Sequence, residues 1–308
     1  MYSVVIPVYN EEANIGLLYK RMTSVISVLS DAFELIFIND GSRDKTLLLV
    51  KELAQSDGRV RYIDLSRNFG HQIAVSAGLD ACRGDRIIII DADLQDPPEL
   101  IAEMDAQMNE GFQVVYARRR KRKGESAAKL WTARLFYRLL ARIASVEIPL
   151  DTGDFRIMDK KVVDVLRSMP EQNKFLRGQI SWIGFRQTFV EYDRSERQGG
   201  KTGYTYAKMF RFALDGITSF SDAPLRLASW MGFVVSGVAF IALLYALYGK
   251  FISHDSEPGW ASLIVSVLFL GGIQLISLGF IGEYLSRISS NVKQRPLYVV
   301  AESNLEND

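Results

Sequence analysis

Two long apolar stretches near the C-terminus constrain the fold of this chain more than any other feature. They span residues 228–248 and 261–284, and Glu283 is the only charged residue inside either of them. A helix needs about 20 apolar residues to cross the hydrocarbon core of a membrane, and each stretch has about that length. The pattern predicts a transmembrane hairpin, and the uninterrupted lengths disfavour the alternative of two buried core helices.

The charges beside this hairpin predict its orientation. Its helices are expected at residues 228–250 and 261–285, with Arg226 before the first and Arg287 and Lys293 after the second. Positively charged residues that flank membrane spans stay in the cytoplasm. Both termini are therefore expected there, in a multi-pass protein of the inner (cytoplasmic) membrane. No signal peptide is expected, because the chain begins with an apolar run and no basic segment precedes it.

The first part of the chain, residues 1–205, alternates between strand and helix patterns. Strands are expected at residues 4–8, 35–38, 60–65, 87–90 and 114–116. Helices are expected at residues 12–29, 45–54, 72–81 and 99–108. Runs that are apolar on both faces suit buried parallel strands, and strand–helix alternation indicates βαβ units. The pattern predicts an α/β domain with a mostly parallel sheet, then juxtamembrane amphipathic helices at 206–227 and, after the hairpin, a cytoplasmic tail at 286–308.

Polar residues follow several of the expected strands, where ligands bind in open α/β sheets. Asp91 and Asp93 come directly after the run at 87–90. Side chains two positions apart on an extended segment point the same way. Two such carboxylates can hold a hard divalent cation, which prefers oxygen ligands. The alternative is an ordinary turn, because aspartate is common in loops and at helix N-termini.

Composition excludes some classes of protein. With 24% charged and 48% hydrophobic residues, the chain is not expected to be disordered. A formal net charge of +1 argues against nucleic acid as a partner. Basic residues are nevertheless concentrated at 118–123, and Arg134 and Arg138 share one face of an expected helix. The single cysteine, Cys82, excludes an internal disulfide, and two histidines without a Cys/His cluster make a zinc site unexpected.

Three motifs, taken in this order, resemble those of inverting family 2 glycosyltransferases with the GT-A fold. They are VVIPVYNEE at residues 4–12, NDGSRD at 39–44 and DADLQDPPE at 91–99. The sequence DTGDFR at 151–156 and the hairpin narrow the resemblance to polyprenyl-phosphate glycosyltransferases. Dolichol-phosphate mannose synthase and the bacterial undecaprenyl-phosphate glucosyltransferases belong to this group. The resemblance covers nearly the whole chain and implies a Rossmann-like GT-A catalytic domain.

The resemblance implies roles for five residues that bind the donor. Pro7, Tyr9 and Glu11 match positions that frame the nucleotide base. Asp40 matches a residue on the base or ribose side, and Asp91 matches one that contacts the nucleotide-sugar. A strand terminus is the plainer interpretation of Pro7 and Tyr9.

The resemblance also implies a metal cofactor. Asp93 and Gln95 match the ligands of Mg²⁺ or Mn²⁺ at the donor diphosphate. A further cation from the loop around residue 200 is expected to meet the diphosphate. Gly203 stands where relatives carry a lysine, so Arg197 is the expected cation and Lys201 the substitute.

The acceptor side is expected to use basic residues close to the membrane. Arg118, Arg134 and Arg138 would bind the lipid phosphate, because a cationic surface attracts anionic headgroups. Asp154 resembles the catalytic aspartate of the family, and its alternative roles are to orient an arginine or to position the sugar. His71 is expected to support the donor pocket rather than to act as a base.

Together these features predict an enzyme that transfers a sugar from a nucleotide-sugar to polyprenyl phosphate, with inversion at C1. The acceptor phosphate has a second pKa of about 6, so it is largely dianionic at neutral pH and needs no strong base. UDP-glucose is the first expected donor, and UDP-GlcNAc, GDP-mannose and UDP-aminoarabinose derivatives stay open. A polysaccharide synthase and a non-catalytic membrane scaffold are the alternatives. Glycines 232, 237, 271 and 272 would permit close helix packing, which leaves a homo-oligomer open.

Overall fold

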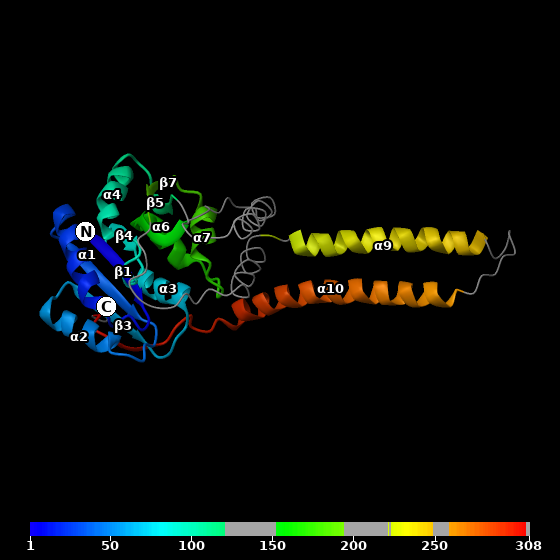
Figure 1. The fold of residues 1–308 in the computed structure, drawn as a ribbon, viewed down its shortest axis with the longest axis horizontal. Coiled ribbons are helices and arrows are strands. Elements are labelled where there is room, and N and C mark those ends of the chain that lie inside the picture. The colour runs from blue at the N-terminus through cyan, green and yellow to red at the C-terminus, as the bar shows by residue number, and fades with distance from the viewer. Residues whose placement is uncertain (121–151, 194–220, 222, 249–258, 306–308) are drawn as a thin grey trace.

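The computed structural model describes residues 1–120, 152–193, 221, 223–248 and 259–305 of the 308-residue chain. These residues form a domain built on one sheet and a separate helical hairpin that extends away from it (Figure 1). The expectations for Arg134, Arg138, Arg197 and Lys201 lie outside the described residues.

One sheet of eight strands, in the order β7-β5-β6-β4-β1-β2-β3-β8, organises the domain. The strands are β1 (Tyr2–Val8), β2 (Phe33–Asn39), β3 (Val60–Leu65), β4 (Arg86–Ile89), β5 (Val114–Arg119), β6 (Thr152–Asp159), β7 (Gln187–Tyr192) and β8 (Val300–Ser303). β6 and β8 run antiparallel to their neighbours, and the other strand pairs are parallel. The predicted α/β class with a mostly parallel sheet is confirmed.

Helices cover both faces of this sheet. They are α1 (Ile15–Leu29), α2 (Thr46–Ser56), α3 (His71–Ala81), the 3₁₀ turn η1 (Pro98–Leu100), α4 (Ile101–Asn109), α6 (Lys160–Ser168) and α7 (Leu176–Ile183). One core cluster joins α1, α2 and α4 to alternate strand residues such as Val4 and Ile6. The second joins α3, α6 and α7 to the intervening residues, such as Val5. Because successive strand side chains point to opposite faces, the apolar runs fill both cores.

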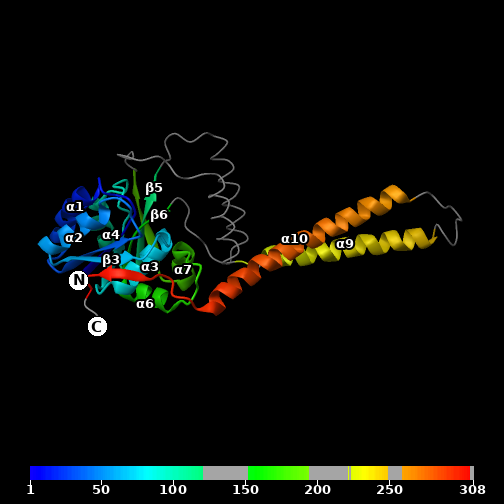
Figure 2. The same cartoon turned by 90° about the horizontal axis from the view of Figure 1, so that it is seen from below.

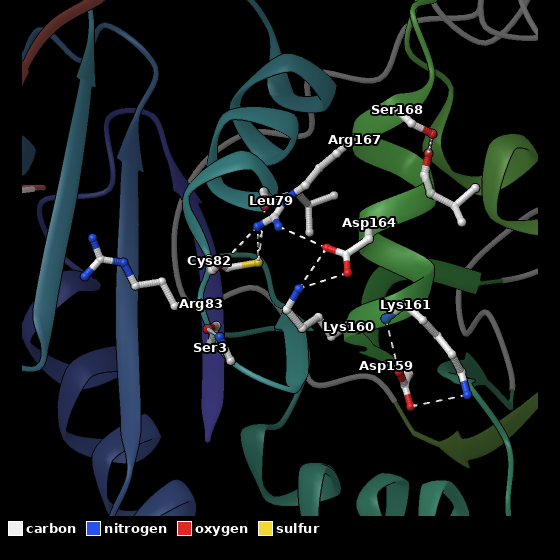
Figure 3. Close-up of polar contacts among 12 residues, drawn as sticks. Ser3, Leu79, Cys82, Arg83, Asp159, Lys160, Lys161, Asp164, Arg167 and Ser168 are labelled. Carbon is white, nitrogen blue, oxygen red and sulfur yellow. Dashed lines mark hydrogen bonds and ion pairs between the residues drawn. The ribbon is translucent and has the colours of Figure 1, made fainter. Parts of the chain in front are cut away.

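An arginine on α6 fixes the C-terminal end of α3, as Figure 3 shows. Arg167 donates from Nε to the carbonyl oxygen of Leu79 at 2.8 Å and from Nη2 to that of Cys82 at 2.6 Å. These carbonyls end the helix and have no partner within it, so a cation there supplies hydrogen bonds and matches the helix dipole. Asp164 holds the same guanidinium at 3.2 Å.

Two long helices, α9 (Ala223–Tyr248) and α10 (Trp260–Lys293), form the hairpin. They lie side by side in both ribbon views and project from the domain (Figures 1 and 2). Both are long and apolar enough to cross a membrane. Large apolar side chains are exposed along them; Phe233, for example, is 80% exposed. Such exposure would be costly in water, so the hairpin is suited to a lipid environment.

The C-terminal segment after α10 returns to the sheet and adds the strand β8, visible in red in Figure 2. β8 pairs antiparallel with β3, the last parallel strand on that side. The sequence pattern placed this segment in a cytoplasmic tail and did not predict a strand there. Residues 286–293 of the expected tail instead continue α10, and only the segment around β8 joins the sheet of the domain.

Candidate active site

The strand β6 brings a distant aspartate to the end of β4. β6 lies between β4 and β5, and its antiparallel register pairs Ile89 with Arg156. Extending that register by two residues sets Asp154 opposite Asp91. The helix α3 begins at His71, directly after Gly70, whose φ of +102° favours glycine. Two strand ends and a helix N-terminus thus meet at one edge of the sheet.

Asp154 is buried and surrounded by hydrogen-bond donors. Its Oδ2 atom lies 3.0 Å from Nε2 of His71 and accepts from Nε2 of Gln72 at 3.2 Å. Its Oδ1 atom accepts from Nε of Arg177 at 3.0 Å and from Nη2 of Arg156 at 3.4 Å. Burial raises the pKa of Asp154, but Arg177, the hydrogen bond from His71 and Arg156 outweigh it and bring the pKa well below its ordinary value. A carboxylate this stable is a poor proton acceptor.

His71 lies between two carboxylates. Besides its contact with Asp154, its Nε2 atom is 3.5 Å from Oδ1 of Asp91. Desolvation lowers the pKa of His71, but the hydrogen bond to Asp154 and the charge of Asp91 outweigh it and raise the pKa to about 9. The imidazole is therefore a cation at neutral pH. Because it already carries a proton on each ring nitrogen, it cannot act as a general base.

The carboxylate of Asp91 fits a cation at this site. Its Oδ1 atom is buried and receives no hydrogen bond from the described residues. Burial raises the pKa of Asp91; the charge of His71 opposes this, the charges of Asp154, Asp96 and Asp93 add to it, and together they bring the pKa to about 6. The neighbouring carboxylates therefore disfavour the charged form of Asp91, and a divalent cation bound there would favour it.

The predicted metal ligands follow in a tight turn. The Oδ1 atom of Asp93 accepts the backbone N–H of Gln95 at 3.1 Å. Leu94 between them has a φ of +56°, in the left-handed region that side chains rarely adopt. Within the described ranges, no three His, Cys, Asp or Glu side chains already form a cluster able to hold a metal. Asp93 and Gln95 as ligands stay a prediction, supported by the charge around Asp91.

A cavity of about 400 Å³ opens at the ends of β1, β2 and β3. It is lined by Tyr9, Asn39, Gly41, Ser42, Arg43, Leu47, Asp64, Leu65, Ser66, Arg67 and Asn68. Tyr9 was predicted for the donor site, and most of the other lining residues follow directly after β2 and β3. Gly41 is required by close packing, since a Cβ there would lie 2.6 Å from the backbone nitrogen of Asn68.

Three other predicted donor residues, Pro7, Glu11 and Asp40, are not among the residues that line this cavity. Asp40 is buried, and its two carboxylate oxygens accept the backbone N–H groups of Phe69 at 2.7 Å and Gly70 at 3.0 Å. Pro7 is buried within β1. Glu11 accepts the side-chain amide of Asn14 at 2.6 Å. Asp40 therefore fixes the loop that leads from the cavity wall to His71.

The predicted acceptor residue Arg118 is already engaged in this structure. It forms an ion pair with Glu191, and its guanidinium lies 3.4 Å from the ring centroid of Phe189. Its neighbour Arg119 points to the other face of the sheet, where Nε donates to the hydroxyl of Tyr192 at 3.2 Å. A lipid phosphate at Arg118 would have to compete with Glu191.

Sequence reasoning missed two residues of the site. Arg177 and Gln72 hold Asp154, yet neither belongs to a recognisable motif. Gln72 follows His71 at the start of α3, so its place in the expected helix could have indicated it. Arg177 lies in the short helix α7 and reaches the site only through tertiary packing.

Comparisons with known proteins identify the family. Residues 3–167 match the profile described as glycosyl transferase family 2, and residues 223–288 match the GtrB C-terminal hairpin. The uncharacterized glycosyltransferase YkcC of Bacillus subtilis is 51% identical over 302 residues, which cover 98% of this chain and 94% of that protein. The SfII prophage-derived bactoprenol glucosyl transferase of Shigella flexneri is 40% identical over 305 residues, 99% of each chain.

A solved structure of glucosyl-3-phosphoglycerate synthase from Mycobacterium tuberculosis, with Mn²⁺, UDP and phosphoglyceric acid, is also similar. Its TM-score is 0.47 at 19% identity, with 71% of this chain and 76% of that chain covered. The family 2 profile matches more than half of the chain, and the relatives match almost all of it. The chain belongs to glycosyl transferase family 2 and is a glycosyltransferase.

Proposed function

We propose that this enzyme transfers glucose from UDP-glucose to polyprenyl (undecaprenyl) phosphate, with inversion at C1. The observation that carries the proposal is the similarity to the bactoprenol glucosyl transferase of Shigella flexneri, which extends through the hairpin to 99% of both chains. Bactoprenol is a lipid, and a hairpin of apolar helices suits an enzyme whose acceptor lies in a membrane.

The cavity at the ends of β1, β2 and β3 is the proposed site of the nucleotide. Its volume of about 400 Å³ is within the range of small-molecule sites. Tyr9 offers an exposed aromatic ring for the base, and Asn39 and Asp64 offer polar groups for the ribose. Asp40, which was predicted to contact the base or ribose, acts in this proposal through the loop that it holds.

The donor diphosphate is proposed to lie beside Asp91, with Mg²⁺ or Mn²⁺ held by Asp93 and Gln95. When bound, such a cation neutralises the charge that develops on the diphosphate leaving group. The buried Oδ1 atom of Asp91 and the carboxylates beside it support this placement. Arg197 and Lys201 are proposed as further contacts to the diphosphate.

Asp154 is proposed to position the reacting groups rather than to remove a proton. Its four donors leave it little capacity to accept another, and its low pKa makes it a weak base. The acceptor phosphate has a second pKa of about 6 and is already a nucleophile at neutral pH. Asp154 instead gathers His71, Arg156 and Arg177 where an attacking phosphate dianion needs positive charge. Arg118, with Arg134 and Arg138, is proposed to guide that phosphate from the membrane.

The sheet also supports the proposed membrane topology. β8 follows α10 and pairs with β3, which precedes α9. This pairing supports a hairpin whose two ends lie on the same side of the membrane. Together with the basic residues beside the hairpin, this supports cytoplasmic placement of both termini and of the catalytic domain.

Transfer by the purified protein tests the proposal directly. The full chain would be incubated with undecaprenyl phosphate, Mg²⁺ and one radiolabelled donor per reaction: UDP-glucose, UDP-GlcNAc or GDP-mannose. Formation of a labelled lipid from UDP-glucose alone is expected. A labelled lipid from another donor would contradict the choice of glucose. A labelled polymer would instead indicate a polysaccharide synthase.

A further inference from the structure

We infer that the C-terminal strand β8 is a positioning element of the donor site, holding one wall of the nucleotide cavity in place. The inference rests on the proposed function, because that function assigns the cavity to the nucleotide. It concerns a segment that lies beyond the hairpin and far from every donor motif in the sequence.

The tail reaches the cavity wall through the backbone. β8 pairs with β3 in a register that sets Leu65 opposite Val300, with an irregularity between Asp64 and Leu65. The pairing continues past the end of β3, where the N–H of Ser66 donates to the carbonyl oxygen of Val299 at 2.9 Å. Asp64, Leu65 and Ser66 all line the cavity. Irregularities of this kind re-aim side chains near functional sites.

The wall is held from two sides. On the side of β2, Nδ2 of Asn39 donates to Oδ1 of Asp64 at 2.7 Å, and the carboxylate of Asp40 holds the loop at Phe69 and Gly70. On the other side, the only strand that pairs with β3 among the described residues is β8. Without β8, the residues from Asp64 to Ser66 would keep their partners on one side alone.

Side chains fix the tail on the sheet. Nζ of Lys51 lies 2.6 Å from a carboxylate oxygen of Glu302, and the hydroxyl of Tyr62 donates to the other at 2.7 Å. Asn304 accepts the N–H of Tyr62 at 2.7 Å and donates to the carbonyl of Val60 at 3.1 Å. These side-chain contacts with both β3 and α2 hold β8 in one defined position on the sheet.

The same segment ties the hairpin to the cavity. α10 ends at Lys293, and Val299 follows six residues later, a span of at most about 21 Å of extended chain. Between them, the hydroxyl of Tyr298 donates to Asp80 on α3 at 3.0 Å. The nucleotide cavity is thereby kept within a short, fixed reach of the second membrane helix.

Asn304→Ala and Glu302→Gln test this inference in the full-length protein. UDP binding with Mg²⁺ would be measured by calorimetry, and amide exchange at Ser66 by deuterium labelling. We expect Asn304→Ala to raise the Kd for UDP about three- to tenfold, a tenfold change being about 1.4 kcal/mol, and to speed exchange at Ser66. Glu302→Gln, which keeps the shape but removes the charge, should give the same changes to a smaller degree.

Asp85→Asn is the matched control, because it breaks an exposed ion pair with the N-terminal amine at the opposite ends of the strands. It should change neither measurement. The KM for donor should rise in the tail variants while kcat and the KM for lipid stay near wild type, a split that general loss of stability would not produce. If Asn304→Ala folds and leaves both the UDP affinity and the exchange at Ser66 unchanged, the inference is overturned. If Asn304→Ala does not fold, the same two measurements on Glu302→Gln decide the question.

The two proposals fail separately. If the wild-type protein binds no UDP, the donor assignment is wrong, while Ser66 exchange still reports whether the tail holds the wall. Faster exchange in the tail variants would then support the positioning role, and unchanged exchange would refute it.

Discussion

Replacing Asp154 with asparagine tests whether this residue positions the reacting groups or acts as a general base. The substitution keeps the shape of the side chain but removes its charge. Asp154 is 9% exposed, and it pairs with Arg177 at 3.0 Å and with Arg156 at 3.4 Å. Removing one partner of a buried ion pair costs about 3–5 kcal/mol. Since the asparagine oxygen can still accept a hydrogen bond, we expect the lower end, about 3 kcal/mol of unfolding free energy.

The expected loss of activity has the same cause, because Arg177 and Arg156 lose the carboxylate that positions them. If about 3 kcal/mol of positioning is lost from the transition state, kcat falls about 10²-fold. General-base catalysis would give a loss of similar size, about 10²–10⁴-fold. The size of the loss therefore does not distinguish the two models, but its dependence on pH does.

The pH dependence has opposite signs in the two models. In the wild type, the pKa of His71 is about 9, so the imidazole stays charged through most of the range from pH 6 to 9. In Asp154→Asn it loses its hydrogen bond to a carboxylate, and its pKa falls toward the ordinary value of about 6.5. The mutant should then lose a cation as pH rises, and its rate should stay flat or fall. A mutant that lacks only a base should speed up instead.

Two measurements check this reasoning. The first is kcat against pH at saturating donor, lipid and metal for the wild type, Asp154→Asn and the exposed control Asp85→Asn. The second is the pKa of His71 by NMR, which is practical because the chain has only two histidines. Recovery of Asp154→Asn to near the wild-type rate at pH 9 would refute the positioning model and make Asp154 a general base.

Three further predictions concern the metal, the acceptor and the membrane. Asp93→Asn should remove most Mg²⁺- or Mn²⁺-dependent transfer, and an unchanged metal titration would exclude Asp93 as a ligand. Arg118→Ala should raise the KM for polyprenyl phosphate about tenfold, the worth of one charge-assisted hydrogen bond, with donor affinity unchanged; an equal loss of donor affinity would place it at the diphosphate. Reporter fusions at Asp308 and within residues 253–257 should report opposite sides of the membrane, and one side for both would exclude a spanning hairpin.

Sequence patterns predicted the parts of the fold whose partners are close along the chain. The runs that became β1 to β4 are apolar on both faces and end at polar residues, so their number and direction followed from alternation with helices. β6 was missed because Asp154 and Arg156 interrupt its apolar pattern where the strand enters the site. β8 was missed because it has four residues and depends on pairing with a strand far away in sequence.

The site shows the same division between local and distant information. Asp91 and Asp93 could be identified because they directly follow a strand. Asp154 lies close to Asp91 because β6 pairs antiparallel with β4 in one particular register. No spacing in the sequence specifies that register. Arg177 reaches Asp154 only because α7 packs on the same face of the sheet as α3.

The pairing of β3 with β8 also sets an order of events during synthesis. Val300 follows Leu65 by 235 residues, so at about 5–20 residues per second β3 waits roughly 12–47 s for its last partner. Throughout that interval, its open edge is a template for wrong pairing with other chains. Both hairpin helices emerge from the ribosome before β8 does, so the sheet closes only after the hairpin has had time to enter the membrane. The last strand of the sheet is therefore added only after the whole hairpin has been synthesised.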